Sequence, residues 1–390
     1  MSASSLEFGL GQRLLRNLTM QSATQGVAIV LGMITPWALT HHSLDPEAFG
    51  GFTYMLGFTM LFLAVSELGI SVTLVREVAL APERTSELLQ SALGLRLVLS
   101  LAVLALGYLV IALLPYVPNV APLSPAYRLA LRAYLWVLPL QAFSVLAVVL
   151  HTRLMIGRGQ IVELANRLTG FTLIMLSVWS GHGLLFVALS LLAGEVVGAI
   201  CLIAMTRDVV PPWPRFDINE WRHLLKLSLP LSASSVLVQM LNRFDQLILQ
   251  AFRPLDQVAF YGAALRLPSL FERLPQLANA TIFPVMSRLA ADDPEALRRV
   301  YRKMMVGLAL VVLPMVLGTV LLAPTIVGVW FGPDYAPAVT LMRVVILATG
   351  LMYVAFAGGN LLIALRRTND NLGAMAWATE PASPMTSSSG

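Results

Sequence analysis

The stretch from Met304 to Val329 reads MMVGLALVVLPMVLGTVLLAPTIVGV and contains no charged side chain. A helix needs about 20 predominantly apolar residues to span the hydrocarbon of a bilayer, so this stretch predicts a transmembrane helix. The run from Leu18 to Leu39 is also uncharged. The chain as a whole has 57% hydrophobic and 12% charged residues and a mean hydropathy of +0.76. An ordinary soluble protein has about 25% charged residues, so a soluble fold is excluded.

Runs of this kind recur along the chain, and about ten of them are long enough to cross a membrane. They are apolar all round, whereas the strands of a membrane barrel are shorter and alternate. The sequence therefore predicts an all-α, polytopic integral membrane protein. The expected spans are Leu18–Leu39, Phe52–Val75, Leu88–Leu114, Leu129–Leu150, Ala165–Trp179, Leu184–Met205, Leu224–Phe252, Val258–Val285, Met304–Val329 and Val339–Leu365.

Lys and Arg are concentrated in alternate loops, for example at Arg153 and Arg158 and from Arg298 to Lys303. The intervening loops, such as the proline-rich residues 115–125, contain few of them. Basic loops remain in the cytoplasm, so this asymmetry predicts the orientation. With an even number of spans, both termini are expected on the cytoplasmic side.

Several functional classes find little support. The net charge of +5 is spread over the loops instead of forming one patch, which argues against nucleic-acid binding. The sequence has no Gly-x-x-x-x-Gly-Lys phosphate loop, so a built-in ATPase is not expected. No catalytic residues, metal ligands or cofactor site are predicted, and we expect no enzymatic activity. A membrane enzyme of glycan assembly is the enzymatic alternative, but it would normally need a sizeable exposed catalytic loop.

The chain repeats itself once. Leu14, Leu15 and Arg16 match Leu224, Leu225 and Lys226, and Arg76 with Pro82 and Glu83 matches Arg288 with Pro294 and Glu295. About six spans separate the copies, so both would enter the membrane in the same direction. Parallel halves with a substrate site between them are a known transporter design. We therefore expect two lobes around a central cavity. The expected parts are a six-helix lobe at 1–206, an interfacial linker at 207–226, a lobe of about four helices at 227–367 and a polar, disordered tail at 368–390.

Seven short motifs, taken in order, resemble the polysaccharide and O-antigen flippases (Wzx type) of the multidrug/oligosaccharidyl-lipid/polysaccharide exporter superfamily. They are Arg13–Asn17 (RLLRN), Glu47–Phe52 (EAFGGF), Ser66–Ile70 (SELGI), Leu227–Pro230 (LSLP), Asn242–Leu247 (NRFDQL), Val258–Ala264 (VAFYGAA) and Phe331–Ala336 (FGPDYA). The resemblance covers about residues 10 to 367. Members usually continue with further membrane helices where this chain turns polar after Arg367. On that ground we expect a C-terminally truncated product.

The resemblance implies that the chain moves a polyprenyl-diphosphate-linked oligosaccharide across a bacterial cytoplasmic (inner) membrane, for export of surface polysaccharide such as lipopolysaccharide. Its implied partners are the lipid-linked oligosaccharide, membrane lipids, an H⁺ or Na⁺ counter-ion and other polysaccharide-assembly proteins. The nearest alternative is a small-molecule or drug antiporter of the same superfamily.

Charged residues inside predicted spans are the candidates for function, because a charge at the bilayer centre costs at least ~2.5 kcal/mol. Asp245 and Arg266 fall at similar depth on adjacent spans, and Arg273 follows Arg266 by one heptad. Such cations suit a diphosphate. We predict that Arg243, Asp245, Arg266 and Arg273, with Asn242, line the substrate path. An ion pair that only stabilises the two spans is an equally weighted interpretation.

Two carboxylates are the candidates for binding a coupling ion. Glu67 lies deep in its predicted span, and Glu195 lies in the middle of its span between Gly194 and Gly198, where small residues favour close helix approach. Arg96 is near the predicted cytoplasmic side, and we expect it to snorkel to the surface. Glu163 and Arg167, four residues apart, are expected to form an ion pair along one helix.

Overall fold

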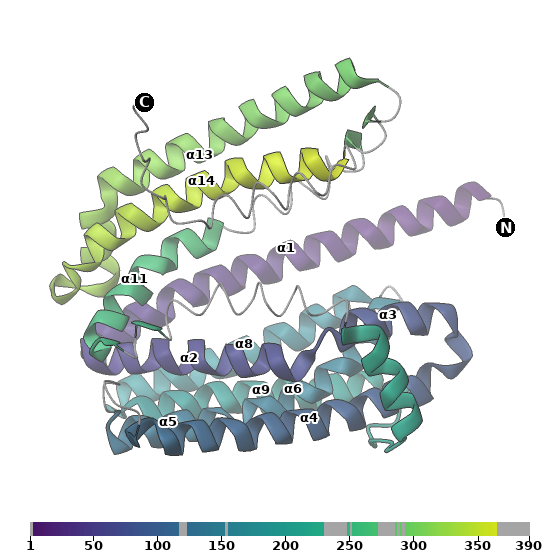
Figure 1. The fold of residues 1–390 in the computed structure, drawn as a ribbon, viewed down its shortest axis with the longest axis horizontal. Helices are drawn as coiled ribbons and strands as arrows, with labels where there is room; N and C mark the ends of the chain where they lie inside the picture. The colour runs from purple at the N-terminus through teal and green to yellow at the C-terminus, as the bar shows by residue number, and fades with distance from the viewer. Residues whose placement is uncertain are drawn as a thin grey trace, which may run out of the picture. The chain divides into compact units, whose positions relative to one another are not determined.

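In the computed structural model, the described residues are 3–116, 123–152, 155–229, 248–249, 252–271, 285–286, 289–290 and 293–364. Throughout these residues the chain is helical or in turns, with no strand (Figure 1). The all-α class predicted from the long apolar runs is confirmed. Backbone groups in a membrane must be satisfied within the chain, and a helix does this within a single segment.

Within the described residues, eight helical segments are long and apolar enough to cross a membrane. The chain is therefore a multi-pass membrane protein. The segments agree with eight of the predicted spans. The span predicted at 224–252 lies mostly outside the described ranges and the one at 258–285 lies partly outside them, so the total of about ten stays a prediction. The eight segments are Thr19–His42, Pro46–Leu80, Pro82–Tyr116, Pro125–Leu150, Gly157–Trp179, Leu184–Thr206, Glu295–Phe331 and Ala338–Gly359.

The second segment is two helices instead of one. Helix α2 (Pro46–Glu67) begins at Asp45, whose carboxylate accepts a hydrogen bond from the Ala48 amide at 2.8 Å. It ends where Leu68 and Gly69 both adopt left-handed conformations, with φ of 42° and 64°. Helix α3 (Ile70–Leu80) then continues the segment. A left-handed residue terminates a helix, so Glu67 lies at a helix end and not within a continuous span.

The fourth segment is also interrupted. It consists of α5 (Pro125–Tyr134), α6 (Val137–Ala142), the 3₁₀ turn η3 (Phe143–Leu146) and α7 (Ala147–Thr152). Pro139 has no amide hydrogen to donate to the Leu135 carbonyl, which instead accepts from the Leu138 amide at 3.0 Å. Hydrogen bonds between residues three apart, instead of four, wind the backbone more tightly where a regular α-helix was expected.

Two compact units make up the chain. Unit 1 contains Met1–Gly262 and Trp330–Asp334, and unit 2 contains Ala263–Val329 and Tyr335–Gly390. Helices α1 (Ala3–His42), α4 (Thr85–Leu113), α8 (Ile156–Trp179) and α9 (Leu184–Thr206) belong to unit 1 together with α2, α3 and α5–α7. Its core includes Leu89, Leu93 and Val145, all fully buried. The short 3₁₀ turns η1 (Pro82–Arg84) and η2 (Leu114–Tyr116) flank α4.

Unit 2 contains most of α13 (Pro294–Phe331) and all of α14 (Ala338–Ala364), which run side by side (Figure 1). A Cβ added at Gly350 would lie 2.9 Å from Val316, so the two backbones approach closely there. Arg343 Nε donates to the Val320 carbonyl at 3.0 Å across the same pair. Helix α11 (Leu255–Phe271) crosses from one unit to the other, and η4 (Pro333–Tyr335) precedes α14.

Residues 207–222, which we call the strap, follow α9 and lie against the start of α4. The Arg215 amide donates to the Gln90 carbonyl at 3.0 Å, and Trp221 Nε1 donates to the Ser91 carbonyl at 2.9 Å. A Cβ added at Gly94 would lie 2.4 Å from the Arg215 carbonyl oxygen. Gly94 is therefore required for the close approach of the strap to α4.

Ion pairs reinforce this contact. Arg84 pairs with Glu220 at 2.5 Å and Arg215 pairs with Glu87 at 2.9 Å. Trp213, Phe216 and Ile218 on the strap are largely exposed. Their placement at a membrane interface, expected from the sequence, stays a prediction.

Candidate functional site

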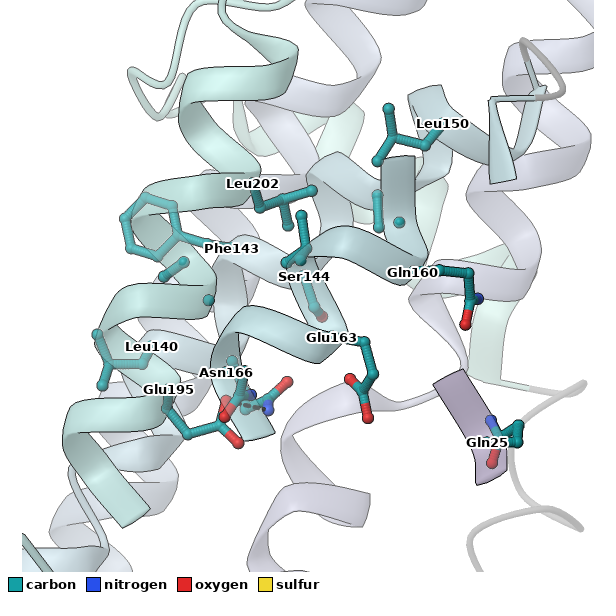
Figure 2. A pocket seen from close by; sticks show the side chains of 16 residues that line it. Gln25, Leu140, Phe143, Ser144, Leu150, Gln160, Glu163, Asn166, Glu195 and Leu202 are labelled. Atoms are coloured by element: carbon teal, nitrogen blue, oxygen red, sulfur yellow. Dashed lines mark hydrogen bonds between the residues drawn. The ribbon is translucent and has the colours of Figure 1, made fainter. Parts of the chain in front are cut away.

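Unit 1 contains an open cavity of about 300 Å³ whose lining includes several polar side chains (Figure 2). Its walls come from α1, from the interrupted segment α6–η3–α7, and from α8 and α9. The polar lining consists of four amides, two carboxylates and one hydroxyl. These are Gln25, Gln141, Gln160, Asn166, Glu163, Glu195 and Ser144.

The irregular part of the fourth segment forms one wall. Gln141 is near the end of α6, and Phe143 and Ser144 lie in the 3₁₀ turn that follows. Irregular backbone at membrane depth is tolerated only inside protein or beside a wet cavity. The interruption of the helix and the polar cavity thus occur at the same place.

Helices α8 and α9 form the opposite wall and are in close contact. A Cβ added at Gly194 would lie 2.7 Å from the Asn166 carbonyl oxygen, and one added at Gly198 would lie 3.1 Å from Asn166 Cβ. The close approach expected at Gly194 and Gly198 is confirmed. Because both glycines lack side chains, Asn166 fits between them and lies beside Glu195.

Glu195 is the central polar group of this wall. Gln141 Nε2 donates to Glu195 Oε2 at 2.8 Å. The Asn166 side chain, which lies beside Glu195 in Figure 2, forms a second hydrogen bond with the carboxylate. Glu195 lies eleven residues from each end of α9, since 195 − 184 and 206 − 195 are both 11. At 1.5 Å per residue this is about 17 Å from either end. The carboxylate therefore lies near the middle of the span.

The other polar groups of the lining differ in whether they have hydrogen-bond partners. Glu163 Oε1 accepts from Arg167 Nε at 2.5 Å, which confirms the ion pair expected along this helix. Gln160 Oε1 is buried without a hydrogen-bond partner. A buried acceptor without a partner is destabilising by about 1–3 kcal/mol, so this oxygen does not stabilise the fold.

The lining carries negative charge. Among the described residues that border the cavity, Glu163 and Glu195 are the charged ones, and none is Lys or Arg. Arg167 pairs with Glu163 from outside the cavity lining and also interacts electrostatically with Glu195, whose hydrogen bonds are with neutral amides. The surroundings therefore favour neutral or cationic ligand groups over anionic ones.

Arg96 corrects a sequence prediction. It does not snorkel, because the residue is only 4% exposed. Its guanidinium donates to Ser144 Oγ at 2.8 Å and to Ser71 Oγ at 3.4 Å, and Glu67 interacts with it electrostatically. Helix α3 and the 3₁₀ turn cover the side chain before it can reach a surface. Since Ser144 also lines the cavity, Arg96 supports the cavity wall from behind.

The structure separates the two carboxylates proposed for ion coupling. Glu195 lines the cavity, whereas Glu67 lies at the break between α2 and α3 and is not among the lining residues. Arg266 is partly buried in α11, in unit 2. Asn242, Arg243, Asp245 and Arg273 lie outside the described residues, so their role in the substrate path stays a prediction. Sequence reasoning missed Gln141, Gln160 and Asn166, whose only signal was an uncharged amide within or beside an apolar run.

Comparison with known proteins identifies the family and the fold. Residues 43–340 match the model of a family described as polysaccharide biosynthesis protein. No curated protein gives a significant sequence match. Three similar solved structures share 15–16% identity with the chain, so they show its fold.

The first is an inward-facing multidrug resistance MATE family transporter of the MOP superfamily, with 16% identity, a TM-score of 0.68, and coverage of 88% of this chain and 82% of that one. The second is the lipid II flippase MurJ in an inward closed conformation, with 15% identity, a TM-score of 0.68, and coverage of 90% and 77%. The third is a MOP superfamily transporter from Pyrococcus furiosus, with 15% identity, a TM-score of 0.54, and coverage of 92% and 83%.

The family match covers most of the chain, and the eight apolar helical segments agree with the membrane-protein folds of these structures. The chain belongs to the polysaccharide biosynthesis protein family and has the fold of the MOP superfamily transporters.

Proposed function

We propose that this protein is a flippase that moves a polyprenyl-diphosphate-linked oligosaccharide across the bacterial cytoplasmic membrane. The observation that carries the proposal is the polar cavity in unit 1. It extends from Gly159 and Gln160, near the predicted cytoplasmic end of α8, to Glu195 near the middle of α9. A hydrophilic headgroup that leaves the inner leaflet needs such a polar environment on its way through the hydrocarbon.

The energetic cost of Glu195 supports a functional role. A carboxylate at the centre of a span costs at least ~2.5 kcal/mol, and such residues mark substrate or ion pathways by default. In this chain it also interrupts the apolar character of α9 where Gly194 and Gly198 bring α8 close. Glu195 is therefore our candidate for carrying a coupling H⁺.

The diphosphate requires positive charge, which the described lining of the cavity does not supply. The predicted path residues Arg243, Arg266 and Arg273 would supply it, with Asn242 and Asp245 beside them. Guanidinium groups bind phosphate oxygens with two parallel hydrogen bonds. We expect Arg266→Ala to abolish flipping at normal membrane levels, and Arg302→Ala, an exposed arginine of α13, to leave it unchanged. Equal loss of protein and activity in Arg266→Ala would support a structural ion pair instead.

Complementation tests the proposal directly. The full chain is expressed in a strain whose own polysaccharide flippase is deleted, and surface polysaccharide is measured. Restored export supports flipping. Failure in a strain that makes the lipid-linked precursor, despite normal membrane levels of the protein, would contradict it. A reporter fused after Arg158 should report the cytoplasmic side, as the basic loops predict.

Antiport of small molecules is a second candidate, and the negative lining of the cavity favours it. Two carboxylates without a lining cation suit a lipophilic cationic drug. Efflux of a cationic dye from cells that lack their main efflux pumps separates the two functions. We expect no efflux, and efflux without complementation would favour the antiporter.

A further inference from the structure

We infer that the cavity of unit 1 is a subsite for a neutral or N-acetylated sugar unit, separate from the site of the diphosphate. The inference rests on the proposed function, because it assigns one part of that substrate to one place. The evidence is the combination of amides, carboxylates, an aromatic ring and one unsatisfied acceptor in a single cavity.

The lining matches the hydrogen-bonding pattern of a sugar. Each sugar hydroxyl can donate one hydrogen bond and accept others, and an amide side chain offers both a donor group and an acceptor. The four amides approach the cavity from α1, α6 and α8, so they surround a ligand instead of forming one stripe (Figure 2). Phe143 and the leucines Leu140 and Leu202 supply apolar surface for the C–H faces of a sugar ring.

Gln160 gives the strongest indication of a missing ligand. Its Oε1 is buried and has no hydrogen-bond partner in the protein. A native structure pairs nearly all its buried polar atoms, so an exception requires an explanation. This oxygen is closed off from the cavity as the side chain stands, so a sugar hydroxyl would complete its hydrogen bonding only once the Gln160 side chain turns toward the ligand.

The size of the cavity fits a small number of rings. Its volume of about 300 Å³ corresponds to roughly ten water molecules at about 30 Å³ each. This is the low end of ligand pockets in proteins. A single hexose with its substituents fits this space.

The charge of the lining selects the class of sugar. The groups that hydrogen-bond to Glu195 are neutral, and Arg167, which interacts with it electrostatically, is already paired with Glu163. A uronic acid or a phosphate placed beside the ionised Glu195 would therefore meet like charge in a medium of low dielectric constant. A neutral or N-acetylated hexose meets no such repulsion. The acetamido group also adds a donor and an acceptor that match the amides.

The orientation of the amides argues against a metal cation as the primary ligand. Gln141 turns its Nε2 donor toward Glu195 Oε2, and the Asn166 side chain is hydrogen-bonded to the same carboxylate. A cation site needs several oxygens that converge on one point. Here a carboxylate oxygen is instead occupied by an N–H donor.

The experiment compares the binding of three soluble probes to the purified full chain in nanodiscs. The probes are citronellyl diphosphate alone and its conjugates with N-acetylglucosamine and with glucuronic acid. We expect the N-acetylglucosamine conjugate to bind about tenfold more tightly than the bare diphosphate, and the glucuronic acid conjugate to gain nothing. Glu195→Gln should reduce the discrimination against the acidic sugar.

Gln160→Met removes the unsatisfied acceptor at similar volume, so it should keep or raise the melting temperature while the tenfold advantage of the sugar conjugate disappears. Gln141→Leu should remove the advantage independently. Gln90→Met is the matched control, because Gln90 lies away from the cavity and donates to the Pro211 carbonyl of the strap. This variant should still bind the sugar conjugate more tightly than the bare diphosphate, by the same factor as the wild type.

The outcomes separate the subsite from the flippase function. If the bare diphosphate and both conjugates bind the wild-type protein equally, or if Gln160→Met and Gln141→Leu keep the sugar advantage, the subsite is wrong and the proposed function stands. If Na⁺ binds at Glu195 and no sugar dependence is found, the cavity is a cation site and the inference is overturned. If none of the three probes binds, the proposed function fails and the subsite fails with it.

Discussion

The cavity and the strap use the same chemistry in opposite surroundings. Where the strap meets η1 and α4, Arg84, Arg215 and Glu87 form ion pairs with about half of each side chain exposed. In the cavity region, Arg96 is almost completely buried and Glu195 lies at mid-span. Water screens the first group of charges but not the second. The comparison teaches that solvent exposure decides what a charged side chain contributes. Exposed ion pairs contribute little to stability, whereas a buried charge is costly and indicates a functional role.

The largest difference should appear in transport when a carboxylate is removed from each region. Glu195→Leu deletes two hydrogen bonds to a charged group, each worth about 1.5–3 kcal/mol, so we expect flipping to fall at least about tenfold. Glu220→Leu removes an ion pair of the strap and should leave flipping near the wild-type rate. Export in the flippase-deficient strain, corrected for protein level, provides the measurement. Equal activity of the two variants would remove the distinction between the regions.

Replacing the buried Arg96 should destabilise the protein more than replacing the exposed Arg84. Arg96→Leu leaves Ser71, Ser144 and Glu67 without their partner, and breaking a buried charge network costs about 3–5 kcal/mol. Arg84→Leu removes interactions that solvent already screens, so its melting temperature should not change measurably. Thermal unfolding in detergent, followed by size-exclusion chromatography, tests both. A similar melting temperature for both variants would show that Arg96 is hydrated.

A smaller effect should distinguish two tight glycines. Gly194→Ala places a methyl group 2.7 Å from the Asn166 carbonyl oxygen between two packed helices, and overpacking of this kind costs about 1–3 kcal/mol. Gly94→Ala meets the Arg215 carbonyl oxygen at 2.4 Å, but the strap can move away because surface ion pairs hold it. We expect Gly194→Ala to lower the melting temperature. Gly94→Ala should mainly make trypsin cleave faster after Arg215. If Gly94→Ala instead lowers the melting temperature as much as Gly194→Ala does, the strap is rigid.

The smallest effect should be the response to salt. At about 1 M salt the Debye length falls to about 3 Å, so the strap ion pairs weaken while the buried groups around Glu195 do not. Trypsin should therefore cut the strap faster at high salt, whereas binding of the neutral sugar conjugate should be unchanged. Cleavage that is independent of salt would assign the strap contact to Trp221 and the backbone hydrogen bonds.

The sequence was sufficient to predict the spans because the length of an apolar run is a local property with a physical threshold. It did not reveal the two breaks. The left-handed turn at Leu68 and Gly69 and the 3₁₀ turn from Phe143 to Leu146 lie inside predicted spans whose average hydropathy stays high. Hydropathy measures whether a segment enters the membrane and contains no information on the backbone conformation it adopts there.

The site was predicted in part for a similar reason. Glu195 was found because a carboxylate in a span is costly, and its glycine neighbours because small residues allow close packing. The amides of Gln141, Gln160 and Asn166 are less costly and acquire meaning only when α6, α8 and α9 come together. Arg96 was assigned wrongly because its position in the sequence suggests proximity to a surface, whereas the packing of α3 and η3 is a tertiary property.

The 3₁₀ turn at Phe143–Leu146 also has a consequence for the dynamics of the backbone. Its hydrogen bonds join residues three apart instead of four and have poorer geometry than those of an α-helix. The turn also borders a polar cavity instead of lipid. Amide hydrogens in the middle of a membrane helix normally exchange with heavy water very slowly, because neither solvent nor base reaches them. In this protein the centre of the fourth segment should take up deuterium before its two ends do, and an occupant of the cavity should slow that uptake without changing the fold.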